Sequence, residues 1–173
     1  CWGFWAVSWR WETKMKLAIS LMLVLLFPFG VSADTLNGKV VKITDGDTLV
    51  VLDADNTQHK IRLSGIDAPE TNQPFGKRSK EALSALVAGQ RVEVDWHKLD
   101  RYGRIVGKVI AQGKDVNLAQ VRTGMAWWYR KYANEQSLVD QGLYEAAEAK
   151  ARVTGVGLWG DKDPIAPWDW RKR

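Results

Sequence analysis

The stretch Ile43-Thr44-Asp45-Gly46-Asp47-Thr48-Leu49-Val50-Val51-Leu52 decides the fold, because it places a tight turn between two apolar segments. Asp-Gly is a strong signal for a β-hairpin when β-branched and apolar residues flank it on both sides. We therefore expect residues 38–44 and 48–52 to form two antiparallel strands. The turn also carries carboxylates, so the same ten residues point to a functional site.

The pattern continues outward from this hairpin as three more strands and three helices. Apolar residues alternate or recur at intervals typical of each element. The expected strands cover 58–63, 91–98 and 104–111, and the expected helices cover 75–88, 116–122 and 135–152. Five strands interrupted by a helix after the third predict an α+β fold, a five-stranded OB-type Greek-key barrel with three α-helices.

Length and composition fit one globular domain, which we place at residues 34–160, followed by an irregular tail at 161–173. Of the 173 residues, 46% are hydrophobic and 26% are charged. The single cysteine, Cys1, excludes a disulfide within the chain and a thiolate zinc cluster. The only histidines, His59 and His97, lie in predicted strands, away from any recognisable nucleophile. A formal net charge of +5 favours polyanions without naming one.

The start of the chain has the pattern of a targeting segment. Met15-Lys16 precedes an apolar run at 17–29, and Val31-Ser32-Ala33 suits signal peptidase. We expect a signal peptide at 15–33, cleaved after Ala33, and a secreted or periplasmic protein without membrane contact after cleavage. The alternative is an uncleaved anchor, although the apolar run is short for a membrane span. We interpret residues 1–14, which contain four tryptophans, as a non-native or upstream extension; the alternative is a membrane-surface segment.

Two further segments carry charged side chains suited to phosphodiester chemistry. They are Arg62-Leu63-Ser64-Gly65-Ile66-Asp67-Ala68-Pro69-Glu70 and Asp100-Arg101-Tyr102-Gly103-Arg104. Carboxylate oxygens are the ligands that a hard divalent cation prefers. Arginine binds phosphate through two parallel hydrogen bonds, which lysine does not imitate.

These residue types divide into three chemical roles at a phosphodiester. Asp47 and Asp67 could hold a cation that polarises the phosphoryl oxygen. Arg62 and Arg104 could clamp the other oxygens, and Glu70, three residues after Asp67, could accept a proton from water. Each segment alone is an ordinary turn, and the prediction rests on their combination.

Four motifs in this order resemble the staphylococcal nuclease (thermonuclease) family. They are Ile43-Thr-Asp-Gly-Asp-Thr48, Arg62-Leu-Ser-Gly-Ile-Asp-Ala-Pro-Glu-Thr71, Asp100-Arg-Tyr-Gly-Arg104 and Val116-Asn-Leu-Ala-Gln-Val-Arg-Thr-Gly124. The resemblance covers residues 37–159. It implies a calcium-dependent nuclease that hydrolyses the phosphodiester bonds of DNA and RNA and leaves 3′-phosphates. We expect the protein to act as a monomer.

The resemblance also assigns roles to individual positions. It implies Ca²⁺ ligation by Asp47, Asp67 and the backbone carbonyl of Ala68. Arg62, Glu70 and Arg104 match the catalytic positions, Glu70 being the proposed base. The implied substrate-binding residues are Arg101, Tyr102 and Tyr132.

Two other functions remain open for a barrel of this type. One is a nucleic-acid-binding module that has lost catalysis. Such a loss usually removes one of the site arginines or the glutamate, and Arg62, Glu70 and Arg104 are all present. The other is a carbohydrate- or protein-binding domain, which has no need for arginines facing carboxylates. Trp127 and Trp128 either stack on bases or fill the core, and Trp159 is expected to pack the last helix onto the barrel.

Overall fold

The computed structural model describes residues 2–3 and 34–173 and divides the chain into two units, residues 1–32 and Ala33–Arg173. All of the described helices and strands belong to the second unit. The predicted signal peptide at 15–33 lies outside the described residues, as does nearly all of the predicted extension at 1–14. Among the described helices, none combines the length and the apolar character needed to cross a bilayer.

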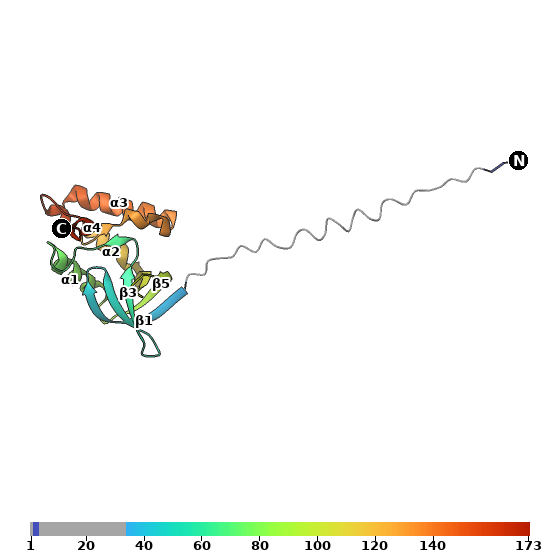
Figure 1. Cartoon of the computed structure of the whole chain (residues 1–173), viewed down its shortest axis with the longest axis horizontal. Coiled ribbons are helices and arrows are strands. Elements are labelled where there is room, and N and C mark those ends of the chain that lie inside the picture. Colours follow the sequence, from blue (N-terminus) through green and yellow to red (C-terminus); the bar gives the residue numbers. More distant parts are fainter. Residues whose placement is uncertain (1, 4–33) are drawn as a thin grey trace. The chain divides into compact units, whose positions relative to one another are not determined.

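The second unit is built on a closed barrel of five strands (Figure 1). They are β1 (Asp34–Asp45), β2 (Thr48–Leu52), β3 (Gln58–Leu63), β5 (Arg91–Leu99) and β6 (Ile105–Ala111). Neighbours pair antiparallel in the order β3-β2-β1-β5-β6, and β6 returns to β3 in a parallel pairing that closes the barrel. The predicted OB-type barrel with helices is confirmed.

Helices cover the barrel and short elements connect them. The helices are α1 (Gly76–Val87), α2 (Val116–Arg122), α3 (Leu138–Thr154) and α4 (Pro167–Trp170), with 3₁₀ helices η1 (Arg130–Glu135) and η2 (Gly157–Gly160). Two-residue strands are β4 (Ile66–Asp67), β7 (Lys114–Asp115) and β8 (Trp127–Trp128). Figure 1 shows α3 lying across one side of the barrel, with α2 between them.

The predicted third helix is wrong at its start. The sequence favoured a helix from 135, whereas η1 ends at Glu135 and α3 begins at Leu138. The reason is local, because the Ser137 side chain accepts a hydrogen bond from the Asp140 N–H and caps the new helix. The tail expected to be irregular contains the single turn α4.

The core of the barrel also fixes the loop after β3. The buried Asn117 side chain of α2 accepts from the Val109 N–H and donates to the carbonyls of Ser64 and Gly107. A buried polar side chain whose hydrogen bonds are all made favours one arrangement of its neighbours, because any other arrangement leaves a buried polar group without a partner. Asn117 therefore holds the loop that leads into β4, from which the carboxylate of Asp67 projects.

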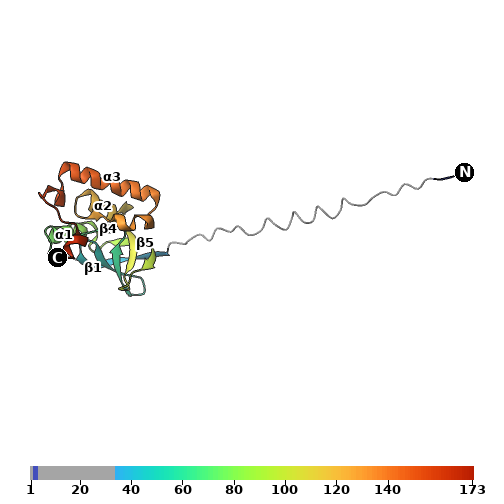
Figure 2. The same cartoon turned by 45° about the horizontal axis from the view of Figure 1, so that its top comes forward.

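The end of the chain returns to the barrel instead of leaving it. Figures 1 and 2 both place the C-terminus beside α1. The Gln73 side chain, just before α1, donates to the Ile165 carbonyl at 2.6 Å. The tail is thereby attached next to the loop that carries Glu70.

Candidate active site

Asp47 is held inside the hairpin turn between β1 and β2. Its Oδ2 accepts from the Ala68 N–H at 2.7 Å, and its Oδ1 accepts from the Thr48 hydroxyl at 3.1 Å. Gly46 permits this close packing, since a Cβ there would lie 1.9 Å from Ser79 Oγ. The turn is thus locked against α1 and the loop after β4.

Arg62, on β3, joins the two carboxylates that the sequence assigned to a cation. Its Nη1 lies 3.0 Å from Asp47 Oδ2, and its Nη2 donates to Asp67 Oδ1 at 2.9 Å. Only 15% of the Arg62 side chain is exposed. Antiparallel pairing sets this geometry, because Arg62 is opposite Thr48, directly after Asp47.

Burial makes Asp47 an unusual carboxyl group. Loss of solvent raises its pKa from 3.8 to about 7, against the opposing attraction of Arg62. The nearby charges of Asp45 and Asp67 raise the pKa further, while the Ala68 N–H lowers it. A site whose negative charges repel one another in this way is stabilised by added positive charge.

Glu70 lies near Asp67, on the more solvent-exposed side of the site. Its side chain is 38% exposed, and its Oε1 accepts from the guanidinium of Arg171 at 2.7 Å. Arg171 Nη2 also donates to Asp67 Oδ2 at 2.7 Å. These two carboxylates raise the pKa of Arg171 above its ordinary value, although partial burial alone would lower it.

Arg104 enters the site from the turn between β5 and β6. Its Nε donates to Asp100 Oδ2 at 2.7 Å, and its backbone N–H donates to Asp100 Oδ1 at 3.0 Å. These bonds lower the pKa of Asp100 although partial burial alone would raise it, and they fix the plane of the guanidinium. Arg101 and Arg104 lie 4.8 and 5.5 Å from the centre of the exposed Tyr102 ring.

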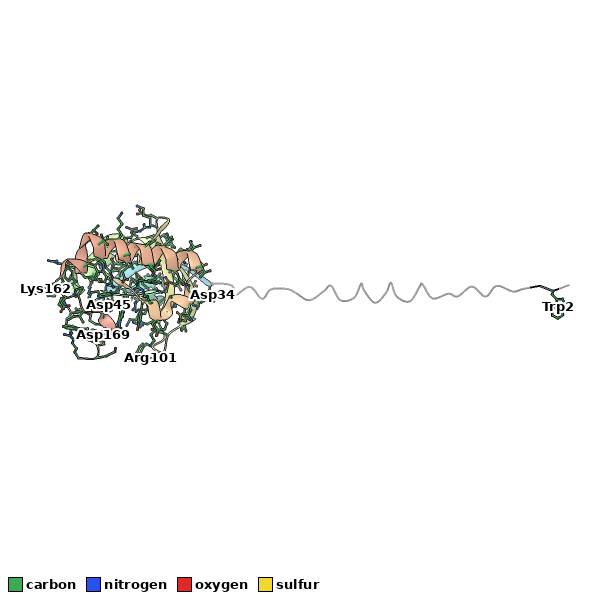
Figure 3. All side chains as sticks on the ribbon, turned by 90° about the horizontal axis from the view of Figure 1, so that it is seen from above. Trp2, Asp34, Asp45, Arg101, Lys162 and Asp169 are labelled. Atoms are coloured by element: carbon green, nitrogen blue, oxygen red, sulfur yellow. The ribbon has the colours of Figure 1, made fainter. Side chains whose placement is uncertain are left out.

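One pocket of about 780 Å³ brings all the predicted site residues together. Its lining includes Asp47, Arg62, Asp67, Ala68, Glu70, Arg101, Tyr102, Arg104 and Tyr132. In Figure 3, Arg101 and Asp169 of α4 lie along the same edge of the domain. The pocket lies at this edge, where the β5–β6 turn and the C-terminal segment converge.

The sequence missed the residues that the tail contributes to this pocket. They are Trp168, Arg171 and Lys172. Two charged residues and one tryptophan in a proline-rich segment show no periodic pattern, so the sequence gives no signal that places them in the pocket. The question of Trp127 and Trp128 is settled in part, since both are buried. Trp159 is buried against Trp127, with ring centres 4.3 Å apart, as expected of a structural residue.

The donor types suit a hard cation, although the carboxylates are engaged by arginines. The described residues contain no group of three or more His, Cys, Asp or Glu side chains already placed around a metal position. Asp47 and Asp67 nevertheless approach one guanidinium within 3.0 Å. Their oxygens and repelling charges match the ligand chemistry of Ca²⁺.

The fold and pocket define an OB-type barrel with a site suited to phosphodiesters. A family model described as staphylococcal nuclease homologue matches residues 60–161. An uncharacterized endonuclease of Haemophilus influenzae is 40% identical over 157 residues, which cover 91% of this chain and 85% of the relative. The chain belongs to the staphylococcal nuclease family.

Two other relatives agree along almost their whole length. An uncharacterized endonuclease of Escherichia coli is 41% identical over 160 residues, covering 92% of this chain and 99% of the relative. The micrococcal nuclease of Shigella flexneri is 38% identical over 164 residues, covering 90% and 91%. The resemblance carried by the motifs is confirmed, and with it the assignment to the nuclease class of enzymes.

Proposed function

We propose that this protein is a calcium-dependent nuclease that hydrolyses phosphodiester bonds of DNA and RNA and leaves 3′-phosphates. The observation that carries the proposal is the convergence of Arg62, Arg104, Glu70 and two buried aspartates on one pocket. The family membership and the endonuclease names of the relatives support the same conclusion. The size of the pocket and its basic rim suit a nucleotide chain.

The protein's own groups have distinct tasks in this reaction. Asp47, Asp67 and the Ala68 carbonyl would hold Ca²⁺, which supplies positive charge to a phosphoryl oxygen when bound. Arg104, whose Nε is held by Asp100, directs its guanidinium plane to a second oxygen. Glu70, the most exposed of the three carboxylates, accepts a proton from the attacking water. Arg62 fixes both aspartates and neutralises charge beside the phosphate.

We also propose that the protein is exported and acts as a monomer. In support, Asp34, the residue directly after the predicted cleavage site, already pairs with Trp96 of β5. Cleavage after Ala33 would therefore leave the barrel whole. N-terminal sequencing of the exported protein tests this boundary, and a first residue beyond Asp34 would contradict it.

Digestion with and without a chelator is the experiment that tests the function. We expect acid-soluble nucleotides from both DNA and RNA in the presence of Ca²⁺, and loss of release with the chelator. End-group analysis should find 3′-phosphates. Binding of nucleic acid without release in calcium would instead favour the non-catalytic module.

Glu70→Gln is expected to lower kcat about a hundredfold, because the amide cannot accept a proton from water. The change keeps the size of the side chain and its acceptor oxygen for Arg171, so KM should change less than about threefold. Steady-state kinetics on a short oligonucleotide separate the two constants. Equal losses in kcat and in substrate affinity would argue against Glu70 as the base.

A further inference from the structure

The C-terminal segment is fixed against the active site by several independent contacts. Trp168 stacks on Tyr129 with ring centres 5.0 Å apart and planes at 3°, and it meets the edge of Trp127 at 5.5 Å. Ala166 and Pro167 are buried. The hydrogen bond from Gln73 to Ile165 fixes the segment just before α4. These contacts place the residue after α4, Arg171, at a defined position.

Arg171 binds the two carboxylates with both of its terminal nitrogens. Its Nη2 lies 2.7 Å from Asp67 Oδ2, its Nη1 lies 2.7 Å from Glu70 Oε1, and the same Nη1 lies 3.3 Å from Asp67 Oδ1. The site thus contains a third guanidinium, from a residue 104 positions after Asp67 in the chain. Such charge-assisted, bidentate contacts are the strong class of hydrogen bond.

Arg171 and a cation compete for Asp67. Both oxygens of this carboxylate already accept hydrogen bonds, Oδ1 from Arg62 and Oδ2 from Arg171. A divalent cation at Asp67 would repel a guanidinium on the same carboxylate, so one of the arginines has to yield. Arg62 is 15% exposed and also binds Asp47, whereas Arg171 is 42% exposed and near the end of the chain. Arg171 is therefore the one that moves.

A guanidinium released from Asp67 remains beside the place where substrate must bind. Arg171 lines the same pocket as Arg62 and Arg104, and α4 anchors its backbone there. Its fork geometry suits two oxygens of a phosphate. Arg171 stays in the pocket and exchanges a carboxylate for a phosphate, so its guanidinium keeps an anionic partner throughout.

We propose that Arg171 is a third active-site arginine, which shields Asp67 and Glu70 before a cation binds and then binds a phosphate of the nucleic-acid substrate. The inference rests on the proposed nuclease function. It gives the tail a role in catalysis through substrate binding, and it makes the tail part of the active site.

Arg171→Gln tests both halves of the proposal, with Arg173→Gln as the matched control. Arg173 is two residues further on, and its guanidinium lies 5.9 Å from the centre of the Trp170 ring instead of on the carboxylates. Both variants remove one arginine from the same tail, so long-range electrostatics are nearly equal in the two. Arg171→Lys keeps the charge and loses the fork.

The first measurement is calorimetric titration with calcium chloride in the absence of substrate. Arg171→Gln should bind Ca²⁺ about five- to tenfold more tightly than the wild type, since the competing guanidinium is gone. Arg173→Gln should stay within about twofold of the wild type. Unchanged or weaker calcium binding by Arg171→Gln would overturn the proposal.

The second measurement is the KM for a short single-stranded oligonucleotide at saturating calcium. Arg171→Gln should raise KM about tenfold, and Arg171→Lys should recover part of this loss. A KM equal to that of the wild type, or equal losses in Arg171→Gln and Arg173→Gln, would overturn the proposal. A wild-type protein that neither binds calcium nor cleaves the oligonucleotide would instead refute the underlying nuclease function.

Discussion

Arg104→Lys is expected to lower kcat for DNA hydrolysis about a thousandfold while the barrel stays folded. The positive charge is retained, so the loss comes from geometry. Asp100 holds the Nε of Arg104 and fixes the guanidinium plane, and a lysine has neither a second nitrogen for Asp100 nor a fork for phosphate. The ion pair is partly exposed, and its removal should cost less than about 1 kcal/mol of stability. Single-turnover cleavage and a thermal melt measure the two effects separately.

Arg101→Lys provides the matched control for this prediction. Arg101 lines the same pocket and is exposed, and its guanidinium contacts the face of Tyr102 at 4.8 Å. A lysine keeps its charge near the substrate, so we expect a loss of less than about tenfold. If Arg101→Lys and Arg104→Lys lose activity equally, the plane set by Asp100 has no special role.

The barrel could be predicted from the sequence because its signals are local. The apolar run after the Asp45-Gly46 turn indicated β2, and alternating residues indicated β3, both with their observed bounds; α2 was also predicted at its observed residues. The start of α3 was predicted wrongly, because the sequence pattern does not separate a helix start at 135 from one after Ser137. The capping hydrogen bond of Ser137 decides this boundary. Closure of the barrel by parallel pairing of β3 with β6 also lies beyond local pattern.

The site could likewise be predicted from the sequence where its residues lie in turns that carry a recognisable motif. Asp47 lies in the β1–β2 turn, next to the residue that pairs with Arg62 of β3, and Asp67 follows five residues after Arg62, so their meeting follows from the hairpin and a short loop. Arg171 does not, because its position depends on stacking between Trp168 and Tyr129 and on burial of Pro167. These tertiary contacts leave no period in the sequence. Ion pairs between the arginines and the aspartates likewise leave no local signal, because they depend on side-chain positions in the folded protein.

Asp47→Asn is expected to stabilise the calcium-free protein at pH 8 while it abolishes calcium-dependent cleavage. In the folded protein the pKa of Asp47 is about 7, whereas in the unfolded chain it is near 3.8. Between these values the unfolded state has released a proton that the folded state retains. The free energy of unfolding therefore falls as pH rises from about 4 to about 7, and the full penalty remains above pH 7.

Asparagine removes this penalty and keeps the local hydrogen bonds. Its carbonyl can accept from the Ala68 N–H, and its amide can donate to the Thr48 hydroxyl, which accepts as readily as it donates. We expect a gain in the free energy of unfolding on the order of 2 kcal/mol at pH 8, shrinking towards zero near pH 4.

Urea unfolding at pH 4, 6 and 8 in chelator measures this gain, and calcium should stabilise only the wild type. If the variant is less stable than the wild type at pH 8, the prediction is wrong and Arg62 neutralises the Asp47 carboxylate fully. Only then does burial of the charged carboxylate carry no free-energy penalty. Under the proposed calcium dependence, the penalty has a functional reason, since a carboxylate that is unstable alone gains the most when a cation binds beside it.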